Sequence, residues 1–222
     1  MVKPRLKTRL GIELIALAIL TTIFLVLFPR RPIFVDESLA LFALLLLAVN
    51  VKFTRNVVWA QFPPPASKRY RLRKCLRLVM TMTFSWVLVL LAVGIAIGYS
   101  QSGWETAFNR VCNWRILIAI CLYFPWGLVQ QTLFQFYLLG RLRTLLPSST
   151  AIICTGLAFA LVHLPDLWVT LATAVTGLFW TYLYYRYRLL TPIALSQAIL
   201  GATFYSWIYG EDLAKTWTEL LI

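Results

Sequence analysis

Long apolar stretches alternate with short polar or basic segments along the whole chain of 222 residues. A helix needs roughly 17–25 mostly apolar residues to cross about 30 Å of hydrocarbon. Stretches that reach or approach this length are residues 10–28, 33–53, 77–99, 115–139, 149–164, 166–186 and 189–209. The pattern therefore predicts an all-α protein, a polytopic membrane bundle of about seven transmembrane helices.

Composition and charge add an orientation to this picture. The chain is 60% hydrophobic and only 13% charged, which excludes a soluble enzyme, a disordered tail and a fibrous repeat. Its 21 Lys and Arg residues outnumber 8 Asp and Glu, for a net charge of +13. With a cytoplasmic N-terminus, sixteen of the basic residues fall inside and seven of the acids outside. This follows the positive-inside rule, so we expect the N-terminus in the cytoplasm and no nucleic-acid partner.

The spans and the basic residues suggest three regions. We expect a three-span region over 1–114 with a basic cytoplasmic loop at 54–77, a four-span core over 115–209, and a short tail over 210–222. A stiff Pro63-Pro64-Pro65 spacer in the loop precedes a basic stretch. Each basic charge near an anionic membrane surface contributes about 1 kcal/mol. Membrane lipids are therefore the expected partners of Lys68, Arg69, Arg71, Arg73 and Lys74.

Few polar side chains fall inside the predicted spans, and at membrane depth each is a functional candidate. The fourth span carries Gln130, Gln131 and Gln135, the fifth carries His163, and the seventh carries Ser196 and Gln197. Counted from the inner boundary, they lie within one or two turns of a common level, which predicts one interior polar cluster. Interhelical hydrogen bonds averaging about 0.6 kcal/mol are the structural alternative.

Other candidate chemistry is sparse. His163 is the single histidine, and zinc needs three or four ligands, so we expect no metal site. Glu13 lies four residues after Arg9, a spacing typical of an ion pair at a helix start. The four cysteines show no CxxC spacing and are expected to be free, buried thiols.

Three short segments in the second half of the chain follow one another in the same order as the motifs of a known protein family. They read Gln130-Gln131-Thr132-Leu133-Phe134-Gln135, then Phe159-Ala160-Leu161-Val162-His163, then Gln197-Ala198-Ile199-Leu200-Gly201. On these segments, residues 115–209 resemble the core of the CAAX protease and bacteriocin-processing (CPBP or Abi) family. That family has Glu-Glu-x-x-x-Arg, Phe-x-x-x-His and His-x-x-x-Asn or Asp. The resemblance implies a helical intramembrane core that hydrolyses peptide bonds.

The departures from the family pattern bear on activity. The resemblance places the two family glutamates at Gln130 and Gln131, the arginine at Gln135 and the last histidine at Gln197. Gly201 takes the place of Asn or Asp, while Phe159 and His163 match. A glutamine amide cannot act as the general base that activates water, and it ligates metal poorly. No Asp or Glu occurs between Glu105 and Asp166. We therefore predict a catalytically inactive member that keeps the scaffold.

Three functions follow as hypotheses. The first is a membrane binding, assembly or scaffold factor that recognises another membrane protein or a hydrophobic ligand, with no cofactor. The second is an intramembrane endopeptidase with a non-standard site using His163. The third is a pigment- or haem-associated membrane protein with His163 as axial ligand. We expect a bacterial inner membrane or a thylakoid membrane as the location.

Overall fold

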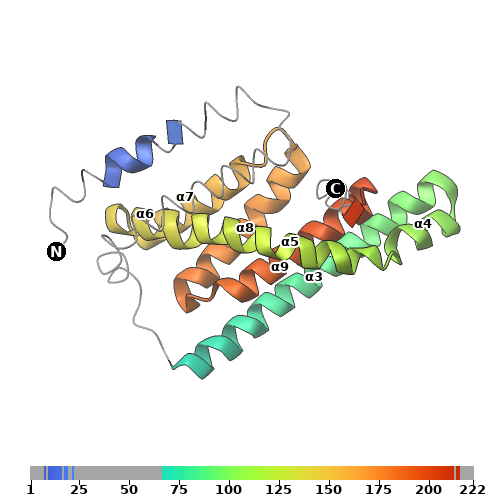
Figure 1. The fold of residues 1–222 in the computed structure, drawn as a ribbon, viewed down its shortest axis with the longest axis horizontal. Coiled ribbons are helices and arrows are strands. Elements are labelled where there is room, and N and C mark those ends of the chain that lie inside the picture. The colour runs from blue at the N-terminus through green and yellow to red at the C-terminus, as the bar shows by residue number, and fades with distance from the viewer. Residues whose placement is uncertain are drawn as a thin grey trace. The chain divides into compact units, whose positions relative to one another are not determined.

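The computed structural model describes residues 8, 10–16, 18, 19, 22, 67–212, 214 and 215, and these are mostly helical with no strand among them. The all-α prediction is therefore confirmed for the described part of the chain. The elements are α3 (Lys68–Ser102), α4 (Trp104–Val111), α5 (Arg115–Gln131), the π-helix η1 (Thr132–Leu138), α6 (Leu139–Leu145), α7 (Ser148–Leu161), α8 (Leu167–Tyr187), α9 (Leu190–Phe204) and the π-helix η2 (Tyr205–Tyr209) (Figure 1).

Three described helical stretches are long and apolar enough to cross a membrane. They are Arg69–Ser102, Trp104–Leu145 and Leu167–Tyr187, and Ser148–Leu161 is a shorter apolar helix. The predicted span at 33–53 lies outside the described residues, as does part of the span at 10–28. The count of seven spans and the side of the N-terminus stay predictions.

The chain divides into two compact units, each built from segments distant in sequence. The first unit comprises Met1–Lys68 and Val129–Leu190, and the second comprises Arg69–Leu128 and Thr191–Ile222. The three regions predicted from the sequence follow chain order, and that division stays a prediction.

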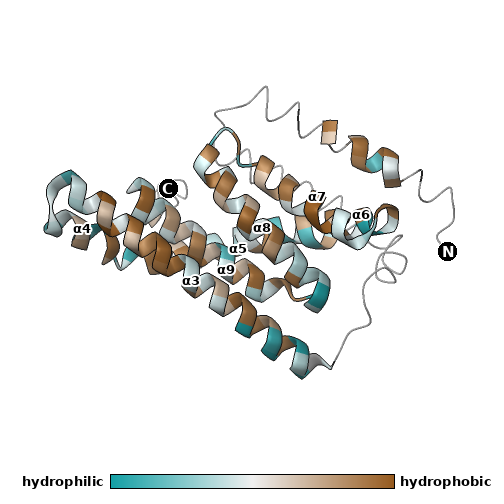
Figure 2. Ribbon diagram, turned by 180° about the vertical axis from the view of Figure 1, so that it is seen from behind, coloured by the Kyte–Doolittle hydropathy of each residue, from teal (hydrophilic) through white to brown (hydrophobic). Residues whose placement is uncertain are grey.

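Two boundaries differ from those predicted. Residues 68–77, expected in a loop, form the first turns of α3. Arg, Lys and Leu are strong helix formers, so the basic stretch continues the apolar helix beyond the hydrocarbon. The first turns of α3 are hydrophilic and its middle is hydrophobic (Figure 2). The predicted fifth span extends too far, because α7 ends at Leu161 and His163 lies in the following turn.

In the first unit, α7 and α8 form an antiparallel hairpin held by small residues. A Cβ placed on Gly156 would lie 2.9 Å from the Leu178 Cα, and one placed on Gly177 would lie 2.9 Å from the Phe159 Cδ1. At the other end of the hairpin, the Ser148 and Tyr185 hydroxyl oxygens are 3.1 Å apart. Small residues allow this close helix packing in a membrane.

In the second unit, α3 runs parallel to α9 and η2. The Thr83 and Ser196 hydroxyl oxygens lie 2.6 Å apart. Eleven residues later in both segments, a Cβ placed on Gly94 would lie 2.8 Å from the Trp207 Cβ. The part of α5 in this unit runs antiparallel to α9, since Gly127 approaches Ala194 and Tyr123 approaches Gly201. These directions agree with those expected of the third, fourth and seventh predicted spans.

The cysteines are free, as expected, but their predicted burial is wrong for three of the four. Cys75 is buried, whereas Cys112, Cys121 and Cys154 are exposed. A cysteine side chain behaves as a small apolar group, so it fits the apolar outer surface of a membrane helix as well as its interior. Residue type alone therefore does not predict its burial.

Candidate functional site

A π-helix occurs where the sequence places its densest group of glutamines. Gln131 ends α5, and Gln135 lies in the middle of the π-helix η1. π-Helical turns are rare and are often found at functional sites. Both glutamines have zero solvent exposure. Hydrophobic periodicity did not indicate the change of helix type.

The Gln135 amide is unusual in its hydrogen bonding. Within the described chain, neither its Oε1 nor its Nε2 has a hydrogen-bond partner, and both atoms are buried. A buried polar group without a partner costs about 1–3 kcal/mol. Gln130 and Gln131 differ, because each has an interaction partner. Gln135 therefore keeps both donor and acceptor capacity available inside the first unit.

Phe159 lies at the centre of an aromatic cluster beside this π-helix. Its ring centroid is 5.2 Å from that of Phe134 in η1, 5.8 Å from that of Trp180 in α8, and 5.1 Å from that of His163. Phe159 itself has zero exposure. These edge-to-face contacts connect η1, α7 and α8.

His163 is oriented by the end of its own helix. Its Nδ1 lies 2.8 Å from the Phe159 carbonyl oxygen. A carbonyl only accepts hydrogen bonds, so Nδ1 is the donor, and in the neutral ring Nε2 then carries the lone pair. His163 thus caps α7 and presents Nε2 as its acceptor or ligand atom.

Gln197 and Gly201 belong to the second unit, where Tyr123 occupies the space beside them. The side chains of Tyr123 and Gln197 share a hydrogen bond. A Cβ placed on Gly201 would lie 2.7 Å from the Tyr123 Cε1. The phenol ring therefore covers the position at which the family resemblance implies an Asn or Asp side chain.

The predicted polar residues divide between the two units. Gln131, Gln135 and His163 share the first unit, with Phe159 packed against both η1 and the His163 ring. Gln197 lies in the second unit. The single cluster drawn from three helices stays a prediction.

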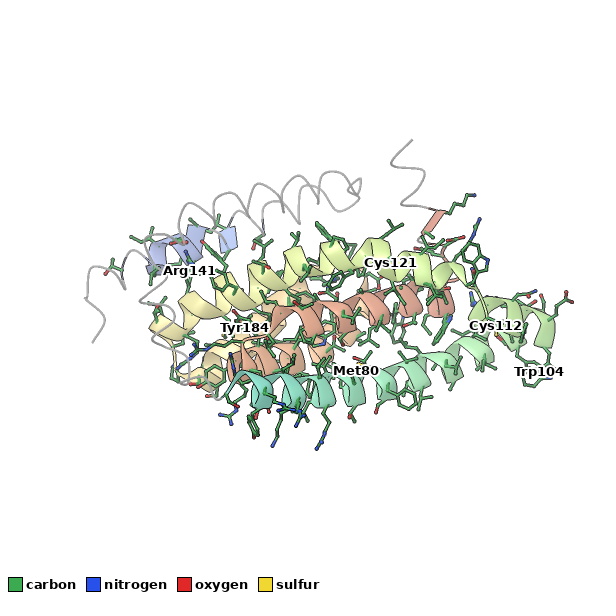
Figure 3. The ribbon with its side chains drawn as sticks, turned by 60° about the horizontal axis from the view of Figure 1, so that its bottom comes forward. Met80, Trp104, Cys112, Cys121, Arg141 and Tyr184 are labelled. Atoms are coloured by element: carbon green, nitrogen blue, oxygen red, sulfur yellow. The ribbon has the colours of Figure 1, made fainter. Side chains whose placement is uncertain are left out.

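Sequence reasoning missed two contacts of this region. Tyr123 had no distinguishing signal, because it is one aromatic residue among many in an apolar helix. Glu13 accepts hydrogen bonds from Arg141 Nε at 2.8 Å and from the Tyr137 hydroxyl. Arg9, its predicted ion-pair partner, lies outside the described residues, so that pair stays a prediction. Arg141 lies beside the N-terminal helical segment at 10–16 (Figure 3).

Among the described residues, no group of three or more His, Cys, Asp and Glu side chains is placed to hold a metal ion.

Comparison with known families agrees with the motif order. Residues 112–209 match the family model described as Type II CAAX prenyl endopeptidase Rce1-like. The predicted resemblance to the CAAX protease family is therefore confirmed for this part of the chain. Together with the apolar helices, it indicates a CAAX-protease-like membrane protein. No curated protein and no solved structure matched the chain.

Proposed function

We propose that this protein is a catalytically inactive, CAAX-protease-like binding or assembly factor that recognises a transmembrane helix of another protein. The observation that carries the proposal is the buried Gln135 amide in η1, which has no hydrogen-bond partner among the described residues. Gln135 has zero solvent exposure, so a partner helix reaches it by displacing side chains packed around η1. Its amide, which both donates and accepts hydrogen bonds, would then pair with polar side chains or carbonyls of that helix.

The chemistry of the substituted positions supports inactivity. Gln130, Gln131 and Gln135 are neutral and cannot take a proton from water near neutral pH. In the second unit, Tyr123 packs on Gly201 and hydrogen-bonds with Gln197. This arrangement leaves no space for the Asn or Asp side chain of the family pattern without moving the phenol ring.

The basic first turns of α3 supply a second contact, with lipid. The side chains of Arg69, Arg73 and Lys74 are exposed. We place them on anionic headgroups of the inner surface, where electrostatic attraction adds to hydrophobic insertion. A bacterial inner membrane or a thylakoid membrane is the proposed location, and it rests on the family resemblance.

The test is co-purification from native membranes in mild detergent. Wild-type protein is compared with Gln135→Leu, which removes both amide atoms, and with Gln101→Leu, the same substitution at an exposed position. We expect a membrane-protein partner to be retained by wild type and Gln101→Leu and lost from Gln135→Leu. Equal recovery by all three, or a lipid as the only retained molecule, would contradict the proposal.

Hydrolysis is tested separately in reconstituted vesicles. Wild-type protein is expected to leave membrane substrates intact. The family's ionisable groups are restored in a variant that combines Gln130→Glu, Gln131→Glu, Gln135→Arg and Gln197→His, and a gain of cleavage in this variant would support the loss of catalysis in the natural chain. Cleavage by wild-type protein that His163→Ala abolishes would instead establish an endopeptidase with a non-standard site.

A second candidate function is pigment or haem association. It is favoured by His163, whose Nδ1 is held by the Phe159 carbonyl and whose Nε2 carries the lone pair. An axial histidine ligand has this arrangement of its two nitrogens. The gently purified protein would then show visible absorption bands that His163→Ala removes, whereas a featureless visible spectrum would exclude this function.

A further inference from the structure

The short helix α4 is fixed against the end of α3. Gly103, between the two helices, has a φ of 83°, a left-handed conformation that glycine adopts without strain. A Cβ placed on Gly98 would lie only 2.6 Å from the Ala107 Cα. The chain therefore reverses at Gly103, and the middle of α4 packs directly on the last turns of α3.

A second contact fixes how α4 is rotated about its axis. Gly210, just beyond η2, has a φ of 74°, and a Cβ placed there would lie 2.5 Å from Arg110 Nη2. Ala107 and Arg110 thus face the rest of the second unit. The opposite side of α4 therefore faces away from the second unit.

The length of α3 gives the depth of α4 in the membrane. Arg77 is the last charged residue of α3, and the following residues 78–97 contain no charge. Twenty helical residues span about 30 Å, the thickness of the hydrocarbon layer. With Arg77 at the inner boundary, we expect Gly98, and therefore Ala107, where the hydrocarbon ends and the headgroup region begins.

The outward surface of α4 has an aromatic side and a polar side. Trp104 and Phe108, four residues apart, are 71% and 65% exposed. Glu105 and Asn109, also four residues apart, are exposed about 100° further around the helix. Figure 3 shows Trp104 projecting from the first turn of α4. This is the residue distribution of a helix that lies along a membrane interface.

The aromatic side continues the apolar outer surface of α3. The ring centroids of Tyr99 and Trp104 are 5.0 Å apart, an aromatic contact between the end of α3 and the start of α4. Further along α3, Phe84 and Leu88 are also exposed, within the uncharged segment. The exposed apolar surface of α3 is thus joined to the aromatic side of α4 through Tyr99 and Trp104.

We propose that α4 lies in the plane of the bilayer, with Trp104 and Phe108 inserted at the boundary between headgroups and acyl chains and with Glu105 and Asn109 in water. Its partner is the phospholipid bilayer itself. Because α4 is fixed to α3 and to Gly210, this contact sets the depth of the second unit. The proposal is independent of the partner helix proposed above.

The test uses nitroxide spin labels on the full chain in phospholipid vesicles. The four native cysteines are replaced by serine, and single cysteines are introduced as Trp104→Cys, Phe108→Cys, Glu105→Cys and Asn109→Cys. We expect labels at 104 and 108 to collide more with apolar oxygen than with a water-soluble nickel chelate, and labels at 105 and 109 to show the reverse.

Two results would overturn the proposal. Labels at all four positions could be accessible to the nickel chelate, which would place α4 in water. Labels at 104 and 108 could be shielded from both reagents, which would mean that protein covers them. All four side chains are exposed, and a monodisperse gel-filtration profile checks that each labelled protein is folded.

Discussion

Arg141 Nε lies 2.8 Å from Oε1 of Glu13, a residue 128 positions earlier in the chain. The Tyr137 hydroxyl donates to the same carboxylate oxygen, and the Arg141 guanidinium carbon lies 3.6 Å from the centroid of the Tyr137 ring. The Arg141 side chain is only 2% exposed. The N-terminal helical segment is thereby attached to η1 and α6 through a buried charge.

Removing the Glu13 carboxylate is expected to destabilise the first unit. Glu13→Gln leaves the Arg141 guanidinium buried without its counter-charge, which costs about 3–5 kcal/mol. Denaturant unfolding in detergent measures the effect. Glu105→Gln, which changes an exposed acid on α4, is the matched control and should be close to neutral.

A paired variant separates the ion pair from simple loss of packing. Glu13→Gln combined with Arg141→Met removes both charges, so much of the lost stability should return. If Glu13→Gln unfolds at the same denaturant concentration as wild type, the contact contributes nothing to the fold.

Filling the space at Gly201 is expected to destabilise the second unit. The Cβ of Gly201→Ala would lie 2.7 Å from the Tyr123 Cε1, and overpacking of this kind costs about 1–3 kcal/mol. Gly11→Ala adds the same methyl group where no atom of the described residues lies within 4 Å. Thermal unfolding of both variants provides the comparison. Equal melting temperatures would mean that the Tyr123 ring moves aside freely.

Replacing Gln135 with leucine is expected to stabilise the isolated protein. Leucine removes two buried polar atoms that have no hydrogen-bond partner in the described chain. The gain should be about 1–3 kcal/mol, the cost of leaving such a group unsatisfied. Unfolding of purified protein in detergent measures it, with Gln101→Leu as control. A loss of stability would show that the amide is satisfied in the folded protein.

Acidification is expected to weaken the contact between Asp212 and Arg115, whose Oδ2 and Nη1 atoms are 2.6 Å apart. Partial burial raises the pKa of Asp212, but hydrogen bonds from Arg115 and from the Lys215 backbone lower it by more. The folded-state pKa therefore lies below the ordinary value. The stabilisation is present above that ordinary value and is lost as the pH falls through the folded-state pKa.

The effect of acid should be small, because the Arg115 side chain is half exposed. Asp212→Asn should remove this part of the acid sensitivity, measured by following unfolding from neutral pH down through the acid range. An unchanged pH profile in this variant would show that the Asp212 carboxylate does not contribute.

The helical class, and the relative directions of the described spans within each unit, could be predicted from the chain. Hydropathy depends only on neighbouring residues, so it predicts each helix by itself. Each charged residue adds independently to the preference of a helix for one direction across the membrane. The helix type at Gln135 could not be predicted, because a π-helical turn differs from an α-helical turn by one residue and leaves no periodic mark in seven residues. The position of His163 was misjudged because an apolar run does not show where its helix ends.

The candidate site was predictable by residue type and not by environment. Motif order located Gln131, Gln135, Phe159 and His163, and the chemistry of amides indicated a loss of hydrolytic function. That Gln135 has no hydrogen-bond partner in the described chain, and that Tyr123 covers Gly201, depends on which side chains surround each position. Those neighbours come from other helices, and spacing along one helix contains no information about them.

The order and type of the residues alone determined the membrane character of this protein, its helices and its family resemblance. Hydropathy and motif spacing are both properties of residues that are near one another in the chain. Tertiary structure decided that Glu13 pairs with Arg141, that Tyr123 packs on Gly201, and that α4 presents Trp104 outward. Each of these joins residues that are distant in the chain or depends on rotation about a helix axis. Such relationships exist only after the helices have packed.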